Sequence, residues 1–120
     1  MYCPSVAVLI DSFNCEHYLP DAIASALNQT YPANDIIVSD VSTDSSASVI
    51  RAHAATDSRI KPVFTANGGQ LATILSGLHV ATSDIIFLLD GDDTYDPQHI
   101  ERLVSYWNQF PDADLMYCRH

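Results

Sequence analysis

Three aspartates stand within four residues at the end of an unbroken apolar run. The run covers residues 85–89, and Asp90, Gly91, Asp92 and Asp93 follow it directly. Carboxylates this close repel one another unless a cation or hydrogen-bond donors hold them. Mg²⁺ and Mn²⁺ are hard cations that take one or two carboxylates together with the phosphate oxygens of a substrate. The stretch therefore predicts a divalent cation site that carries a phosphate-bearing ligand.

Two more aspartates, Asp11 and Asp40, come at the ends of other apolar segments. If these segments are neighbouring parallel strands, both carboxylates converge with Asp90 on one crevice. Open α/β sheets bind ligands at that edge. A single aspartate at a strand end is commonly a helix cap. Several such residues from separate strands favour a ligand site instead.

A glycine-rich turn supplies a second kind of candidate. Its residues 67–70 have the sequence NGGQ and precede an apolar helical pattern. Backbone N–H groups at Gly69 and Gln70 are candidates to approach a phosphate at the start of that helix. The turn lacks the lysine of a P-loop and the spacing of the Rossmann fingerprint, so a plain turn is the alternative. Phe13, at a strand exit, suits either stacking on a base or core packing.

Other metal sites fit the sequence less well. Asp90, Asp92, Thr94 and Glu101 match positions of an EF-hand calcium loop, but Tyr95 stands where that loop needs glycine. The histidines form no zinc-binding pair, and the three cysteines include no Cys-x-x-Cys pair. Neither a structural zinc nor a disulfide framework is therefore expected, and a reduced cytosolic setting fits best.

Strand and helix patterns alternate along the chain. Strands are expected at residues 6–10, 36–38, 60–65, 85–89 and 115–118, and helices at 18–29, from about 46 to 55, from about 70 onward and from about 97 to 110. This βαβαβαβαβ order predicts an α/β fold with a three-layer αβα parallel sheet. Pro62 predicts an edge position for the third strand.

Two burial patterns are expected in these elements. The run at residues 85–89 has the composition of a strand that is buried on both faces. The helix after the glycine-rich turn carries an apolar stripe that is expected to face inward, formed by Leu71, Ile74, Leu75 and Leu78.

Composition limits the classes of function. The 120 residues are 48% hydrophobic, enough for a core, and carry a formal net charge of -10. Such acidity argues against binding to nucleic-acid backbones or anionic lipid. The sequence shows neither a signal-peptide pattern nor an apolar run long enough to span a membrane. It stops after an expected strand without a closing helix, so we expect part of a domain.

Five short motifs follow one another in a recognisable order. They are VLIDSFN at 8–14, YLPDAIASALNQTYP at 18–32, IIVSDVSTDS at 36–45, NGGQ at 67–70 and LLDGDD at 88–93. The series resembles the N-terminal, nucleotide-sugar-binding half of family 2 glycosyltransferases of the GT-A fold, and the resemblance covers nearly the whole chain. It implies strand order 3-2-1-4 in a truncated Rossmann-like sheet, with the acceptor half of the domain beyond residues 1–120.

The resemblance also implies roles for individual residues. Asp11, Phe13 and Asp40 would hold the base and ribose of a nucleotide-diphosphate sugar, most often a UDP-sugar. Asp92 would bind Mg²⁺ or Mn²⁺ directly, and Asp90 would contact the ribose or the metal. The reaction would invert the anomeric centre and transfer the sugar to an unknown glycan, lipid or protein acceptor. The general base would lie beyond His120.

The sequence departs from the family pattern at several positions. The family commonly has Pro at the position of Asp11, Tyr at Phe13, Asp at Ser39 and Gly at Val41. An Arg-Asn pair is also common where this chain has residues 73–74, Thr-Ile. These departures leave open a non-catalytic sugar-nucleotide-binding or interaction module of the same fold.

A signalling receiver domain is a further alternative, because its length, acidity and βα order are similar. However, receivers have an aspartate after the third strand and a lysine after the fifth. This chain has no aspartate directly after its third expected strand, and its one lysine is Lys61.

Overall fold

The computed structural model describes residues 3–65 and 69–110. Its strands are β1 (Val6–Ser12), β2 (Asp35–Asp40), β3 (Ile60–Phe64) and β4 (Ile85–Asp90). All neighbouring strands are parallel, and the order is β3-β2-β1-β4. This confirms the expected α/β class and strand order. The strand expected at residues 115–118 lies outside the described residues.

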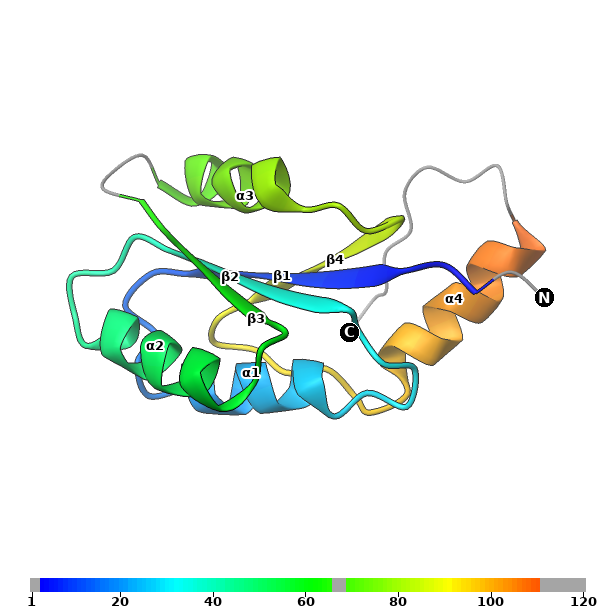
Figure 1. Cartoon of the computed structure of the whole chain (residues 1–120), viewed down its shortest axis with the longest axis horizontal. Helices are drawn as coiled ribbons and strands as arrows, with labels where there is room; N and C mark the ends of the chain where they lie inside the picture. Colours follow the sequence, from blue (N-terminus) through cyan, green and yellow to red (C-terminus); the bar gives the residue numbers. More distant parts are fainter. Residues whose placement is uncertain (1–2, 66–68, 111–120) are drawn as a thin grey trace.

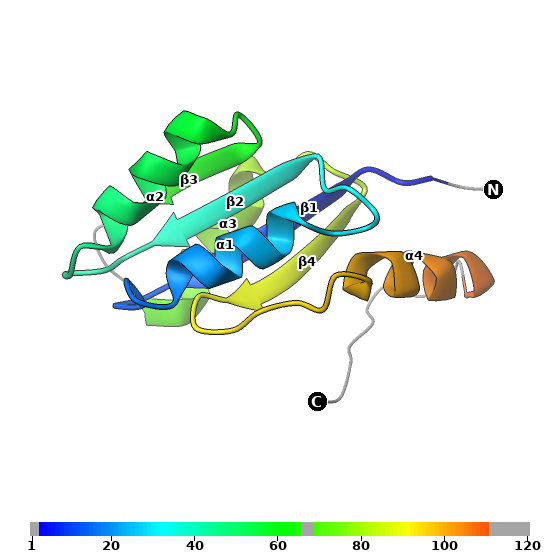
Figure 2. The same cartoon turned by 90° about the horizontal axis from the view of Figure 1, so that it is seen from below.

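The helices lie in two layers on the two faces of the sheet. The described residues form helices α1 (Leu19–Leu27), α2 (Ser46–Thr56), α3 (Gly69–Val80) and α4 (His99–Gln109). Buried residues of α1, α2 and α4 form one core with Val6, Val8 and Ile10 of β1. Of the described helices, only α3 covers the opposite face, as Figures 1 and 2 show. The expected three-layer arrangement is therefore confirmed.

Strand β1 lies at the centre of both cores. Its residues from Val6 to Ile10 have no exposed surface, and alternate residues point to opposite layers. Ala7 and Leu9 belong to the smaller core under α3, together with Ile37 of β2. A hydrophobic strand between two helical layers explains why its sequence is a continuous apolar run rather than an alternating pattern.

Helix α3 approaches the sheet closely through a glycine. A Cβ placed on Gly77 would lie 2.0 Å from Leu9 Cδ1, which is far inside van der Waals contact. One turn earlier, Thr73 is buried, and its carbonyl oxygen accepts a 2.6 Å hydrogen bond from Ser39 Oγ of β2. The small residue at 77 and the polar contact at 73 therefore fix α3 over β1 and β2.

This placement corrects the expected inward face of α3. Leu71 and Leu75 are 69% and 54% exposed, whereas Ile74 and Leu78 are partly buried against the smaller core. The apolar periodicity predicted the helix, but the close approach at Gly77 turns a different face toward the sheet.

Strand β4 also departs from its expected burial on both faces. Ile85, Phe87 and Leu89 are buried under α1 and α4, whereas Leu88 on the other face is 53% exposed. The reason is that α3 covers β1 and β2 rather than β4. At the opposite edge, β3 pairs with β2 alone, which confirms the edge position that Pro62 predicted.

Among residues 3–65 and 69–110, no helix has the length and apolar character needed to cross a bilayer.

We expect Gly77→Val to lower the free energy of unfolding by about 1–3 kcal/mol, because the added methyl groups collide with the buried Leu9 side chain. Leu75→Val is the matched control, since it puts the same β-branched residue on the exposed face of α3 and should change the free energy of unfolding by less than about 0.5 kcal/mol. Urea denaturation followed by circular dichroism measures both. Equal losses in the two variants would contradict the close approach.

Candidate nucleotide-sugar site

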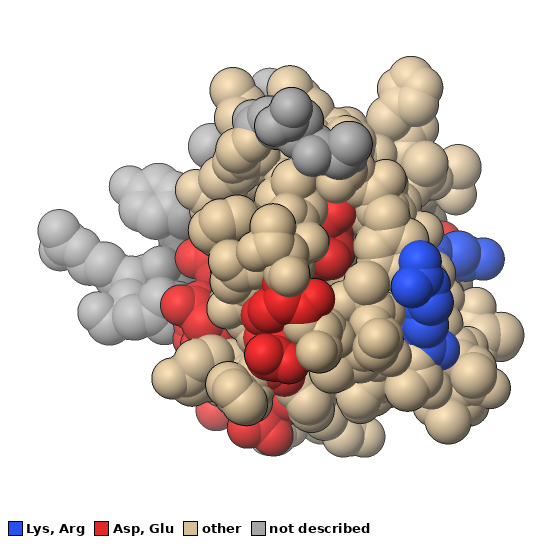
Figure 3. All heavy atoms as spheres, turned by 90° about the vertical axis from the view of Figure 1, so that its left-hand side faces the viewer, with Lys and Arg blue, Asp and Glu red and all other residues tan. Residues whose placement is uncertain are grey.

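A cavity of about 550 Å³ opens at the carboxyl ends of β1 and β4, beside the first turn of α3. Its lining combines carboxylates, small polar groups and one exposed aromatic ring: Asp11, Ser12, Phe13, Cys15, Val41, Thr43, Gly69, Gln70, Thr73, Asp90, Gly91 and Asp92. Figure 3 looks onto this end of the molecule, where acidic side chains gather and the Lys and Arg side chains lie toward one flank.

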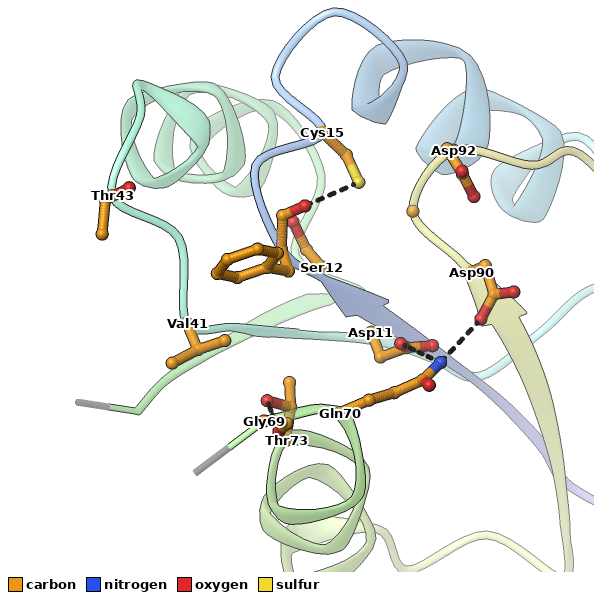
Figure 4. Close-up of a pocket in the computed structure, with 12 residues that line it drawn as sticks. Asp11, Ser12, Cys15, Val41, Thr43, Gly69, Gln70, Thr73, Asp90 and Asp92 are labelled. Atoms are coloured by element: carbon orange, nitrogen blue, oxygen red, sulfur yellow. Dashed lines mark hydrogen bonds between the residues drawn. The ribbon is translucent and has the colours of Figure 1, made fainter. Parts of the chain in front are cut away.

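The parallel register of β1 and β4 places Asp11 directly opposite Asp90. Gln70, in the first turn of α3, reaches both carboxylates (Figure 4). Its Nε2 amide donates to Asp11 Oδ2 at 3.0 Å and to Asp90 Oδ1 at 3.4 Å. One amide group therefore bridges two acidic side chains that would otherwise repel each other.

The carboxyl of Asp11 is a weaker acid than an ordinary aspartate side chain. Its pKa rises from the ordinary value of 3.8 to about 6, chiefly because burial penalises the charged carboxylate. The hydrogen bond from Gln70 acts in the opposite direction, while the neighbouring Asp90 raises the pKa further. The protonated form of Asp11 is thus present over part of the mildly acidic range.

The loop after β4 is held tightly against β1. Gly91 N donates to Asp11 O at 2.9 Å, and a Cβ at Gly91 would lie 3.1 Å from that same oxygen. Asp92 follows as an exposed residue that lines the cavity. Asp93 is outside the lining, and its Oδ1 accepts a bond from Thr94 N at 2.9 Å. The three aspartates therefore have different surroundings.

The donor set fits a metal that shares its ligands with a substrate. Within the described part of the chain, no group of three or more Asp, Glu, His or Cys side chains is assembled to hold a metal ion. Asp90 and Asp92 instead offer two carboxylates to one cavity. Mg²⁺ and Mn²⁺ accept that arrangement, because they commonly complete their coordination with water and phosphate oxygens.

The far side of the cavity has a different character. Figure 4 shows Val41 and Thr43 across the cavity from Asp90 and Asp92. The Phe13 ring also lines the cavity, and 63% of this residue is exposed to solvent. Asp40, in contrast, is 2% exposed, lies outside the lining and accepts a short hydrogen bond from Ser42 Oγ.

The structure thus brings together most of the residues that the sequence singled out. Asp11, Phe13, Gly69, Gln70, Asp90 and Asp92 share one cavity, whereas Asp40 sits beneath the neighbouring loop. Their roles toward a nucleotide or a metal stay predictions.

The sequence patterns assigned no binding role to several lining residues, namely Ser12, Cys15, Val41, Thr43, Thr73 and Gly91. Ser12 is 1% exposed, and its hydroxyl has no hydrogen-bond partner among the described residues. The pKa of the Cys15 thiol is raised, chiefly by burial, which argues against a thiolate nucleophile. The sequence offered one indication that Ser12 lines the cavity, namely its position between Asp11 and Phe13.

The comparisons with known proteins identify the family. Residues 7–120 match the family model described as "Glycosyl transferase family 2". The chain is therefore a member of glycosyltransferase family 2. An uncharacterised glycosyltransferase of Nostoc sp. is 36% identical over 117 residues, covering 96% of this chain and 35% of that protein.

A second relative, an uncharacterised glycosyltransferase of Haemophilus influenzae, is 35% identical over 106 residues, or 87% of this chain and 33% of the relative. The chain thus spans about a third of the length of these curated relatives.

Solved structures show the same fold. The mannosyltransferase PcManGT from Pyrobaculum calidifontis, in complex with GDP-Man and Mn²⁺, has a TM-score of 0.81 and 23% identity over 88% of this chain and 33% of that chain. S. aureus TarS 1-349 in complex with UDP has a TM-score of 0.78 and 17% identity over 88% of this chain and 32% of that chain. These likenesses establish the GT-A architecture of the sheet and its helices.

The acidity of Asp11 predicts a specific pH dependence of stability. The folded-state pKa of Asp11 is about 6, above the ordinary 3.8, so the protonated carboxyl is favoured in the folded state. The contribution of this carboxyl to the free energy of unfolding is fully present below about pH 4 and is lost as the pH rises through about 6. Relative to Asp11→Asn, the free energy of unfolding of the wild type should fall by about 1–2 kcal/mol from about pH 4 to 7, after allowance for solvent screening.

Urea titrations in EDTA across this pH range measure the difference between the two proteins. Parallel pH profiles for the wild type and Asp11→Asn would show that the carboxyl of Asp11 titrates normally.

Proposed function

We propose that this chain forms the donor site of a metal-dependent glycosyltransferase that uses a nucleotide-diphosphate sugar, with a UDP-sugar as the leading candidate. The observation that carries the proposal is the composition of the cavity. Three carboxylates line it together with an exposed aromatic ring, and the described residues of its lining include no Lys, Arg or His. Family membership and the nucleotide complexes of structural neighbours support the same conclusion.

The charge balance argues for a divalent cation. A diphosphate is repelled by Asp90 and Asp92 unless a positive charge compensates, and no basic side chain is found among the described residues of the lining. A bound Mg²⁺ or Mn²⁺ would supply that charge and would neutralise the diphosphate as it leaves. In this proposal Asp92 is a direct metal ligand, and Asp90 contacts either the metal or the ribose.

The two ends of the cavity suit the two ends of a nucleotide. The diphosphate belongs near Asp90 and Asp92, and the base belongs near Val41 and Thr43. Phe13 also lines the cavity, and the adjacent Asn14 is bonded to Thr43, so we assign the Phe13 ring to the base end. An exposed phenylalanine at that position can stack on a nucleobase, which restores apolar contact to a ring that otherwise faces water. Gly69 and Gln70, in the first turn of α3, lie where backbone N–H groups can approach a phosphate.

The reaction proposed is transfer with inversion. An acceptor hydroxyl attacks the anomeric carbon, the bond between that carbon and the diphosphate oxygen breaks, and the acceptor loses its proton to a base. We assign that base to a part of the protein beyond His120. The role of residues 3–110 is to bind and orient the donor.

UDP and Mn²⁺ together should raise the melting temperature of the chain, because a ligand that binds the folded state stabilises it. Asp92→Ala should abolish the rise, since it removes the exposed carboxylate proposed to bind the metal. Asp93→Ala is the matched control, because Asp93 is adjacent and exposed but lies outside the cavity lining.

Differential scanning fluorimetry with UDP, GDP and ADP, each with and without Mn²⁺, measures the effect. No shift with any nucleotide would contradict a donor site, and an equal loss in Asp93→Ala would contradict the assignment of Asp92.

A further inference from the structure

Two loops beside the cavity are joined through one side chain, that of Asn14. Its Oδ1 accepts hydrogen bonds from Thr43 N at 2.9 Å, Thr43 Oγ1 at 3.3 Å and Asp44 N at 3.3 Å. Its own backbone N–H donates to Ser42 Oγ at 2.8 Å. Asn14 follows β1, whereas residues 42–44 follow β2, so these bonds connect the β1–α1 loop to the β2–α2 loop.

The carboxylate of Asp44 strengthens the same connection. Asp44 Oδ2 accepts a bond from Glu16 N at 3.4 Å, and Asp44 Oδ1 accepts one from Ser46 N at 2.9 Å. Burial alone would raise the pKa of Asp44, but the hydrogen bonds from Ser46 and Glu16 lower it below its ordinary value. Asp44 is thus ionised at neutral pH and accepts bonds from both sides of the junction. We call this set of bonds, centred on Asn14 and Asp44, the loop clamp.

The conformation of Asn14 explains the residue type. Its φ is 51°, and it is the one non-glycine residue with positive φ in the described chain. Asparagine tolerates this left-handed conformation better than most residues. The same conformation turns the chain sharply after Phe13. Asn14 therefore provides both the backbone turn and the acceptor that fastens it to the next loop.

The loop clamp bears directly on the cavity. Phe13 and Cys15, on either side of Asn14, both line the cavity, and so does Thr43, which Asn14 binds. Phe13 is 63% exposed, so packing of its ring contributes little to its position. The backbone on which Phe13 stands must then determine where the ring lies, and the clamp holds that backbone at a fixed separation from Thr43.

We propose that Asn14 is a positioning residue that sets the width of the nucleobase slot between Phe13 and the β2–α2 loop. This inference rests on the proposed donor site and adds a residue that does not line the cavity. A preformed slot binds a base without the cost of ordering a loop, so loss of the clamp should weaken binding of the base. Binding of the diphosphate, at Asp90 and Asp92, should change little.

The test uses isothermal titration calorimetry on the full chain and compares two probes, UDP and inorganic pyrophosphate. Mn²⁺ is present in both titrations. Asn14→Ala should raise the Kd for UDP about tenfold and change the Kd for pyrophosphate by less than about twofold. Asn14→Asp keeps an acceptor at Oδ1 and should restore most of the UDP affinity. Ser42→Ala removes one bond of the clamp together with the bond from Ser42 Oγ to Asp40, and it should give a smaller loss of the same kind. It provides a milder variant should Asn14→Ala fold poorly.

Asn34→Ala is the matched control. The Oδ1 of Asn34 accepts a bond from Val6 N at 2.9 Å at the opposite end of the sheet, so this change also removes an asparagine bond to backbone but leaves the cavity intact. Its affinities for UDP and pyrophosphate should equal those of the wild type.

Three outcomes would overturn the inference. Asn14→Ala could weaken the binding of UDP and of pyrophosphate equally, or Asn14→Ala and Ser42→Ala could both leave the affinity for UDP unchanged. The third is a loss of affinity for UDP alone in Asn34→Ala. If the wild type binds pyrophosphate and Mn²⁺ but no nucleotide, the base slot itself is refuted. If the wild type binds neither probe, the proposed donor site fails, and the inference fails with it.

Discussion

The parallel pairing of β1 with β4 is the constraint on which the rest of the site depends. Parallel strands end at the same edge of a sheet, so the register that pairs the two apolar runs also brings Asp11 opposite Asp90. A partly buried carboxylate beside a second, exposed one is electrostatically unfavourable. The amide of Gln70 donates hydrogen bonds to both side chains and so reduces the repulsion. The pKa of Asp11 is raised to about 6, so its carboxyl can also be neutral at mildly acidic pH.

The position of α3 follows from a second constraint, the small residue at its contact with the sheet. Gly77 lets the helix approach Leu9, and that approach fixes where the first turn of α3 lies. Gln70 in that turn then reaches the two carboxylates. The same placement leaves Leu88 of β4 and Leu75 of α3 substantially exposed. Helix position, cavity chemistry and exposed apolar surface therefore have one common origin.

In the proposed donor site, the two ends of the cavity are positioned in different ways. At one end, exposed carboxylates suit a cation shared with a diphosphate, and this end depends on the β1–β4 pairing. At the other end, an exposed ring depends on the loop clamp, which joins segments that are about 30 residues apart in the sequence. Rigid strands position the first end and hydrogen-bonded loops position the second.

Much of this could be predicted from the sequence, because β1 and β4 are continuous apolar runs and their terminal aspartates must meet at one edge of a parallel sheet. The resemblance to family 2 glycosyltransferases implied the strand order, and Pro62 predicted the edge position of β3. Burial of Leu71, Leu75 and Leu88 could not be predicted correctly, since it depends on where a helix settles rather than on periodicity. The sequence by itself determined the elements and the edge at which the carboxylates gather. Tertiary structure alone decided which groups contact one another, such as Gln70 with Asp11 and Asn14 with Thr43, because those bonds form only after distant segments have packed.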